Sequence, residues 1–168
     1  MARNTPKQPR GTAKDRALLL LGVRWRSREE LRRRLCSVGF DPAEVEVALA
    51  DLEDIGLIED GRFAREMARD QAGRRLAGNR SIRAGLLQKG VAREHVDEAL
   101  QDAGDESERA LELARQRAAR LAGLDRETVY RRLYGLLVRR GYLPGTARAA
   151  CTAALGEVLE GGSVPEGE

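Results

Sequence analysis

The segment LRRRLCSVGFDP, residues 31–42, decides the fold, because it has the pattern of one helix ending and another beginning. Before its glycine, apolar residues keep the i, i+4, i+7 spacing of one helix face: Leu31, Leu35 and Val38. Gly39 suits the position just after a helix, where a positive φ is easy without a Cβ. Asp41-Pro42 then predicts an N-cap and a first-turn proline. The segment therefore predicts two amphipathic helices joined by a glycine turn.

The same turn recurs every 51 residues along the chain, at Gly39, Gly90 and Gly141. An apolar residue follows each glycine: Phe40, Val91 and Tyr142. Apolar residues also stand eight and four positions before each one: Leu31, Ile82 and Leu133, then Leu35, Leu86 and Leu137. A further helix is expected before each pair, over about 13–24, 60–76 and 106–122. A fixed period of this length is the signature of a repeat architecture.

We therefore predict an all-α protein of three tandem three-helix repeats, nine helices in all, forming an elongated, curved array. The repeats are expected over 13–58, 59–104 and 105–160. Residues 1–12, a basic tail, and residues 161–168 lack helical periodicity and are predicted to be disordered. Ser27 and Glu30 predict a capping box at the start of a helix. Trp25 lies between two predicted helices and is interpreted as a hydrophobic plug.

Charge follows the repeat, although the whole chain carries only +3. Residues 1–40, 61–93 and 113–140 have net charges of +8, +7 and +6, whereas residues 41–60 and 94–112 have −8 and −7. The first two helices of each repeat are thus basic, and the third is acidic except in the last repeat. Two interpretations remain open: a solvated surface with intramolecular ion pairs, or a site for a polyanion or an acidic protein.

The middle repeat carries the clearest candidate site. Arg62, Arg65 and Arg69 share one helix face, opposite the face of Phe63, and the basic character continues beyond that helix. The full set of candidate binding residues is Arg62, Arg65, Arg69, Arg74, Arg75, Arg80, Arg83, Arg28, Arg32 and Arg33. The residues expected to carry the fold are Gly39, Gly90, Gly141, Phe63, Ile82 and Leu86.

Catalytic and metal-binding patterns are missing from the sequence. There is one histidine, His95, and the two cysteines have no ligand spacing. No phosphate-binding glycine motif or nucleophile elbow occurs. The apolar run 17–23 is too short to cross a bilayer. We therefore expect a cytoplasmic protein, without membrane, cofactor, metal or catalytic residues, and not an enzyme.

The middle repeat resembles the RecX family of recombinase regulators. The resemblance rests on the run GLIEDGRFA, residues 56–64, and on a spaced set of later residues: Arg75, Gly78, Ile82, Leu86, Lys89, Gly90, Val91 and Leu100. The match covers about residues 16–104, and the last repeat follows mainly through the 51-residue register. Each piece is short, but their ordered combination is specific.

This resemblance implies a modulator of the RecA recombinase, acting in DNA repair, recombination and the SOS response. Such proteins are tandem three-helix repeats that bind the RecA–DNA filament and limit its growth, ATPase and strand exchange, without catalytic residues of their own. We expect a monomer that contacts DNA through the filament, with weak direct DNA binding. Two other functions stay open from the residues alone: a direct DNA-binding protein of helix-turn-helix type, and a protein-interaction scaffold.

Overall fold

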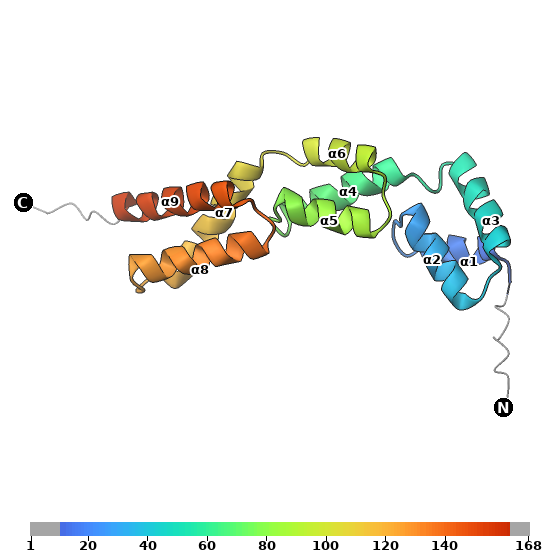
Figure 1. Ribbon diagram of the computed structural model, residues 1–168, viewed down its shortest axis with the longest axis horizontal. Helices are drawn as coiled ribbons and strands as arrows, with labels where there is room; N and C mark the ends of the chain where they lie inside the picture. The colour runs from blue at the N-terminus through green and yellow to red at the C-terminus, as the bar shows by residue number, and fades with distance from the viewer. Residues whose placement is uncertain (1–10, 162–168) are drawn as a thin grey trace, which may run out of the picture. The chain divides into compact units, whose positions relative to one another are not determined.

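The computed structural model describes the backbone of residues 11–161 and the side chains of residues 11–156 (Figure 1). Within that part of the chain there are nine α-helices, one short 3-10 helix (η1) and no strand. Their order is α1 Ala13–Leu21, α2 Arg28–Val38, α3 Pro42–Asp54, α4 Asp60–Gly73, α5 Asn79–Gln88, α6 Arg93–Gln101, α7 Glu106–Ala118, η1 Ala119–Leu121, α8 Arg126–Arg139 and α9 Pro144–Gly161. The predicted all-α class and its nine helices are confirmed.

The helices belong to two compact units that share the middle repeat. Unit 1 contains the described residues up to Met67 together with Leu86–Ala99, and unit 2 contains Ala68–Gly85 and the described residues from Leu100 onward. Helices α4, α5 and α6 therefore each contribute to both units. The repeat boundaries proposed from the sequence stay a prediction.

The three repeated glycines end the second helix of each repeat, as the sequence predicted. Gly39, Gly90 and Gly141 have φ values of 106°, 77° and 90°, in the left-handed region where a Cβ is disfavoured. After the first of them, the side chain of Asp41 accepts hydrogen bonds from the N–H groups of Ala43 and Glu44, with Pro42 as the first helical residue. Local chemistry thus places the turns.

Two details at helix starts differ from the sequence predictions. Ser27 caps α2, but Glu30 does not complete the capping box, because its carboxylate pairs with Arg26 at 2.9 Å and with Lys89 at 3.1 Å. A complete capping box is formed instead by Thr12 and Asp15 at the start of α1. Thr12 thus belongs to the folded part, and Gly161, predicted to lie in the second tail, is the last residue of α9. Residues 1–10 and 162–168 of the two predicted tails lie outside the described residues.

Each unit has its own apolar core. In unit 1 it is formed by Ala13, Ala17, Leu20, Leu31, Leu35, Phe40, Val45, Ala48, Leu49, Leu52 and Ile58. In unit 2 it is formed by Ala110, Leu113, Ala114, Ala118, Val129, Leu133, Leu137, Tyr142, Ala147, Ala150, Cys151, Ala154 and Leu155. In the middle repeat, Phe63 is 5% exposed, and Ile82 and Leu86 are fully buried. Leu31 and Leu35 of the predicted apolar face of α2 are buried, whereas Val38, in the last turn of the helix, is 40% exposed.

In unit 1, the start of α2 is joined to the middle repeat by two hydrogen bonds. The hydroxyl of Ser27 donates to the carbonyl of Lys89 at 2.6 Å, and the N–H of Arg28 donates to the carboxylate of Asp60 at 2.8 Å. Burial raises the pKa of Asp60, while the hydrogen bond from Arg28 opposes that shift. The N-terminus of α2 is therefore capped both by Ser27 of its own repeat and by Asp60 of the next repeat.

In unit 2, the start of α5 is joined to the last repeat in the same way. The N–H of Gly78 donates to the carbonyl of Arg140 at 2.9 Å, and the N–H of Asn79 donates to the carboxylate of Glu106 at 2.7 Å. Gly78, Asn79 and Arg140 stand 51 residues after Ser27, Arg28 and Lys89, respectively. Asp60 and Glu106 are the first residues of α4 and α7. Three of the four contacting positions thus keep the 51-residue register, whereas the two carboxylates, each at the first residue of its helix, stand 46 residues apart.

Replacing Ser27 with alanine is expected to lower the free energy of unfolding by about 1–3 kcal/mol. The Ser27 side chain is fully buried, accepts from the N–H of Glu30 at 3.1 Å and donates to the carbonyl of Lys89, so its loss leaves two partly buried backbone groups without this partner. Urea denaturation measures the change. The control is Ser37→Ala, which removes an exposed hydroxyl bonded only within its own helix and should change stability by less than about 0.5 kcal/mol. Equal effects of the two substitutions would contradict the assigned role of Ser27.

Candidate functional site

The first candidate arginine, Arg62, packs against an aromatic ring. Its guanidinium lies 4.3 Å from the centroid of Trp25, which is 41% exposed. The prediction that Trp25 plugs the space between two helices is therefore wrong. Leu20, Leu31 and the other core residues already close that space, and the indole lies in the α1–α2 loop beneath an arginine instead. A cation over a tryptophan ring is a favourable contact even at the surface.

The other two arginines predicted for this face of α4 are also engaged. Arg65 is half-buried and forms an ion pair with Glu59 at 3.4 Å, whereas Arg69 is exposed and interacts elsewhere in the chain. Arg62 is exposed as well. The face thus combines accessible positive charge with an exposed tryptophan.

In the first repeat, the three candidate arginines form intramolecular ion pairs. Arg28 contacts Glu46 at 2.7 Å and Glu53 at 3.1 Å. Arg32 and Arg33 contact Glu29 at 2.6 and 2.7 Å. The pKa of Glu29 is lowered to about 2, above all because Arg32 donates hydrogen bonds to its carboxylate. These arginines fit the interpretation of a surface with ion pairs better than that of an open anion site.

The remaining candidates lie near the α4–α5 loop and on α5, in unit 2. Arg74 pairs with Asp70 at 3.2 Å, but 86% of its side chain is exposed. Arg75 is exposed, and its carbonyl accepts a hydrogen bond from Arg140. Arg80 and Arg83 are exposed on α5. Arg74 and Arg75 line a shallow depression together with Arg117 and Arg140.

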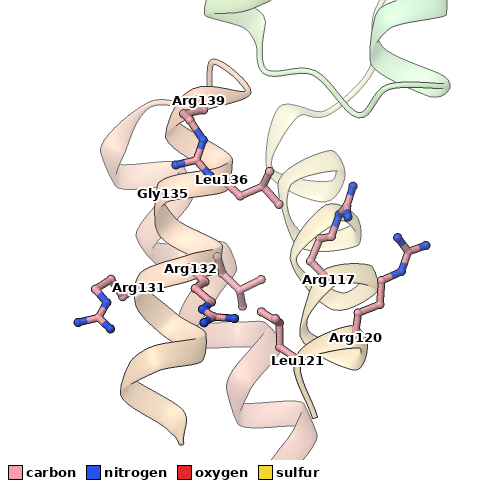
Figure 2. A pocket seen from close by; sticks show the side chains of 9 residues that line it. Arg117, Arg120, Leu121, Arg131, Arg132, Gly135, Leu136 and Arg139 are labelled. Atoms are coloured by element: carbon pink, nitrogen blue, oxygen red, sulfur yellow. The ribbon is translucent and has the colours of Figure 1, made fainter. Parts of the chain in front are cut away.

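A more concentrated set of arginines lies in the last repeat, which contains none of the candidate binding residues predicted from the sequence. A groove of about 480 Å³ runs between α7 and α8, and we call it the α7–α8 groove. Its lining is Arg117, Arg120, Leu121, Arg131, Arg132, Leu133, Gly135, Leu136 and Arg139. Figure 2 shows the arginines of α8 on one side and Arg117 and Arg120 on the other, with Leu121 and Leu136 between them. The groove therefore has an apolar floor and basic edges.

The arginines of the α7–α8 groove differ from those of the first repeat in their partners. Among the residues whose side chains are described, no ion pair joins a carboxylate to Arg117, Arg120, Arg132 or Arg139. The pKa of Asp125 is lowered mainly by a hydrogen bond from the N–H of Thr128, and only weakly by the charge of Arg131. The basic charge of the groove is therefore largely uncompensated. Because Arg117 also lines the depression beside Arg74 and Arg75, the two basic surfaces are continuous.

The sequence showed the charge of this region but not its pairing. Residues 113–140 have a net charge of +6, close to the +8 of residues 1–40. What separates the two regions is the position of the acids: Glu29 lies one helical turn from Arg32 and Arg33, and Glu46 and Glu53 reach Arg28 through the fold. The uncompensated arginines occur where the third helix of the repeat is not acidic, and that signal was visible in the charge pattern.

Guanidinium groups bind carboxylate and phosphate oxygens through paired, charge-assisted hydrogen bonds. The arrangement therefore suits the binding of anions. Over residues 11–156, no group of three or more His, Cys, Asp or Glu side chains is placed to hold a metal ion. No helix in the described part of the chain combines the length and apolar character needed to span a bilayer.

Known proteins show the same organisation. The model of the first three-helix domain of RecX matches residues 13–52, and that of the second matches residues 60–100. A crystal structure of RecX from Lactobacillus salivarius has the same fold, with a TM-score of 0.74, although it is only 21% identical; the similarity covers 84% of this chain and 94% of that one.

Two curated relatives, each described as regulatory protein RecX, show closer similarity in sequence. The protein from Amycolatopsis mediterranei is 36% identical over 144 residues, which cover 84% of this chain and 82% of the relative. The protein from Mycobacterium sp. (strain KMS) is 39% identical over 145 residues, which cover 82% of this chain and 79% of the relative. With this identity over most of both chains, the present chain belongs to the RecX family of regulatory proteins.

Proposed function

We propose that this chain is a non-catalytic inhibitor of the RecA recombinase that binds the RecA–DNA filament and limits its growth, ATPase and strand exchange. The observation that carries the proposal is membership of the RecX family, with both three-helix domain models matched in order along the chain. The proteins of this family that the chain resembles are named regulatory proteins. Regulation of a filament suits a tandem repeat, because successive repeats can engage successive protomers.

The physical character of the surface supports the same function. Accessible arginines are present in the middle repeat, at Arg62, Arg69 and Arg80, and in the α7–α8 groove. A nucleoprotein filament presents both phosphates and acidic side chains, and either can pair with arginine. The exposed Trp25 under Arg62 adds the pair of residue types most enriched among binding hot spots.

The test is the ATPase activity of RecA on single-stranded DNA while this protein is titrated in. The steady-state rate should fall as the protein approaches the concentration of RecA protomers, and the loss should be reproduced when filaments are formed first. An unchanged rate at stoichiometric protein would overturn the proposal. Sequence-specific nanomolar binding to naked duplex, with no effect on RecA, would favour the direct DNA-binding function instead.

Replacing Arg62, Arg65 and Arg69 together with alanine is expected to leave the fold intact and to weaken RecA inhibition roughly ten-fold, because such charges set the encounter rate and complementarity. None of the three forms part of the buried apolar core. The midpoint of thermal unfolding and the inhibition of ATPase are measured on the same sample.

The matched control replaces three other exposed arginines, Arg16, Arg93 and Arg148, and removes the same charge. It should inhibit RecA like the unmodified protein. If the Arg62, Arg65 and Arg69 variant melts earlier but inhibits normally per folded molecule, those arginines act only in intramolecular contacts. The proposed binding face on α4 would then be wrong.

A further inference from the structure

The α7–α8 groove has the features of a binding site. Five arginines border it, and four of them form no ion pair with a described carboxylate. We propose that this groove binds the sugar–phosphate backbone of a single nucleic-acid strand. The inference rests on the proposed function for its setting, since a RecA filament is assembled on single-stranded DNA.

Charge is the first step of the inference. Like charges gathered around one groove repel each other, so the cluster is unfavourable unless an anion neutralises it. Elsewhere in this chain, the sequence supplies that anion: Glu46 and Glu53 for Arg28, and Glu29 for Arg32. Around the groove it supplies almost none: α8 has Glu127 as its single acid among 14 residues, and the acids of α7, Glu106, Glu108 and Glu112, do not line the groove. An external polyanion completes the electrostatics of the groove.

Shape indicates one strand rather than a duplex. The groove follows the line where two helices meet, and its volume of about 480 Å³ has room for an extended strand but not for a duplex. Leu121, Leu133 and Leu136 form an apolar floor, and Gly135 adds no side chain to it. Sugars and base faces can rest on such a floor while the phosphates reach the arginines on either edge. A duplex would reach the groove only by the outside of one backbone.

The presence of arginines on both edges of the groove favours a nucleic acid over an acidic peptide. A single strand carries a phosphate at every nucleotide, which matches arginines on both edges at Arg117 and Arg120 on one side and Arg131, Arg132 and Arg139 on the other. The planar guanidinium of arginine also forms paired hydrogen bonds with phosphate more readily than the ammonium group of lysine, which acts as a point charge. The depression beside Arg74, Arg75 and Arg140 extends the same basic path within unit 2.

The experiment uses the full chain and no RecA. A groove variant carries Arg117→Ala, Arg120→Ala, Arg132→Ala and Arg139→Ala, and a charge-matched control carries Arg16→Ala, Arg34→Ala, Arg93→Ala and Arg148→Ala. Circular dichroism and thermal unfolding check that both fold. Fluorescence anisotropy then measures binding of a labelled 15-nucleotide oligothymidine, a duplex of the same length and poly-glutamate, between low and moderate salt.

We expect the groove variant to bind oligothymidine at least ten-fold more weakly than the control. Its salt slope should be smaller by up to about 3, from about 0.7 for each of the four lost phosphate contacts. The unmodified chain should bind oligothymidine more tightly than the duplex or poly-glutamate. Equal affinities of the two variants would overturn the site. Tighter binding of poly-glutamate would assign the groove to an acidic protein, and tighter binding of the duplex would overturn the single-strand assignment. A failure of the proposed function shows separately, as an absence of ATPase inhibition by a chain that binds the oligonucleotide.

Discussion

Replacing Phe63 with alanine is expected to lower the free energy of unfolding by about 3–5 kcal/mol, from lost apolar transfer and the cavity left behind. The ring is 5% exposed and lies in α4, in the run of residues that carries the family resemblance. The ammonium of Lys89 lies 6.0 Å from its centroid, and the carbonyl of the same residue accepts the hydrogen bond from Ser27. Phe63 thus supports the segment of unit 1 through which α2 contacts the middle repeat.

Chemical denaturation monitored by circular dichroism measures this loss. A matched control is Ile55→Ala, because Ile55 is also a large apolar residue near a helix end but is 63% exposed. Its replacement should change stability by less than about 0.5 kcal/mol. A loss below about 1 kcal/mol for Phe63→Ala would contradict its role in the core. The ring would then have to be accessible, as a contact residue would be.

The fold could be predicted from the sequence because the helices and turns of each repeat depend on residues that are close together in the chain. Apolar spacing, the glycine ends and caps such as Asp41 all concern residues within a few positions of each other, and they were confirmed. The predictions that were wrong concern side chains that contact other partners in the fold than the sequence indicated. Glu30 does not complete the predicted capping box because its carboxylate forms ion pairs with Arg26 and Lys89. Trp25 is not buried as predicted, because its ring contacts the guanidinium of Arg62 at the surface.

The candidate site was less accessible to sequence reasoning, because binding depends on which charges remain unpaired. Arg28, Arg32 and Arg33 were named beside arginines of the middle repeat, yet they are held by glutamates 3 to 25 residues away in the chain. Arg117, Arg132 and Arg139 were not named, although the absence of an acidic third helix after them was part of the charge pattern. The net charge of each helix therefore indicates where arginines have acidic residues available as ion-pair partners. Only the folded structure shows which arginines form those ion pairs.

Replacing Gly141 with alanine is expected to lower the free energy of unfolding of the chain by about 2–5 kcal/mol, for two separable reasons. Its φ of 90° disfavours an L-residue by about 1–2 kcal/mol. An added Cβ would also lie 2.5 Å from both the Cβ and the backbone nitrogen of Ser81, and relieving such overpacking typically takes about 1–3 kcal/mol more. The same contact region includes Gly78, where an added Cβ would lie 2.4 Å from the carbonyl carbon of Gly141.

Gly123→Ala separates the two reasons, because Gly123 has a nearly equal φ of 94° and nothing within 4 Å of an added Cβ. It should therefore lose only the conformational part, about 1–2 kcal/mol. The difference between the two variants, read from urea denaturation, measures the close packing of the α8–α9 turn on the start of α5. That packing stands beside the hydrogen bond from Gly78 to Arg140, so its loss should also speed hydrogen exchange at the Gly78 N–H. Equal losses for the two variants, with unchanged exchange at the Gly78 N–H, would contradict the second reason. The turn would then need glycine at position 141 for its backbone conformation alone, and not for its close contact with α5.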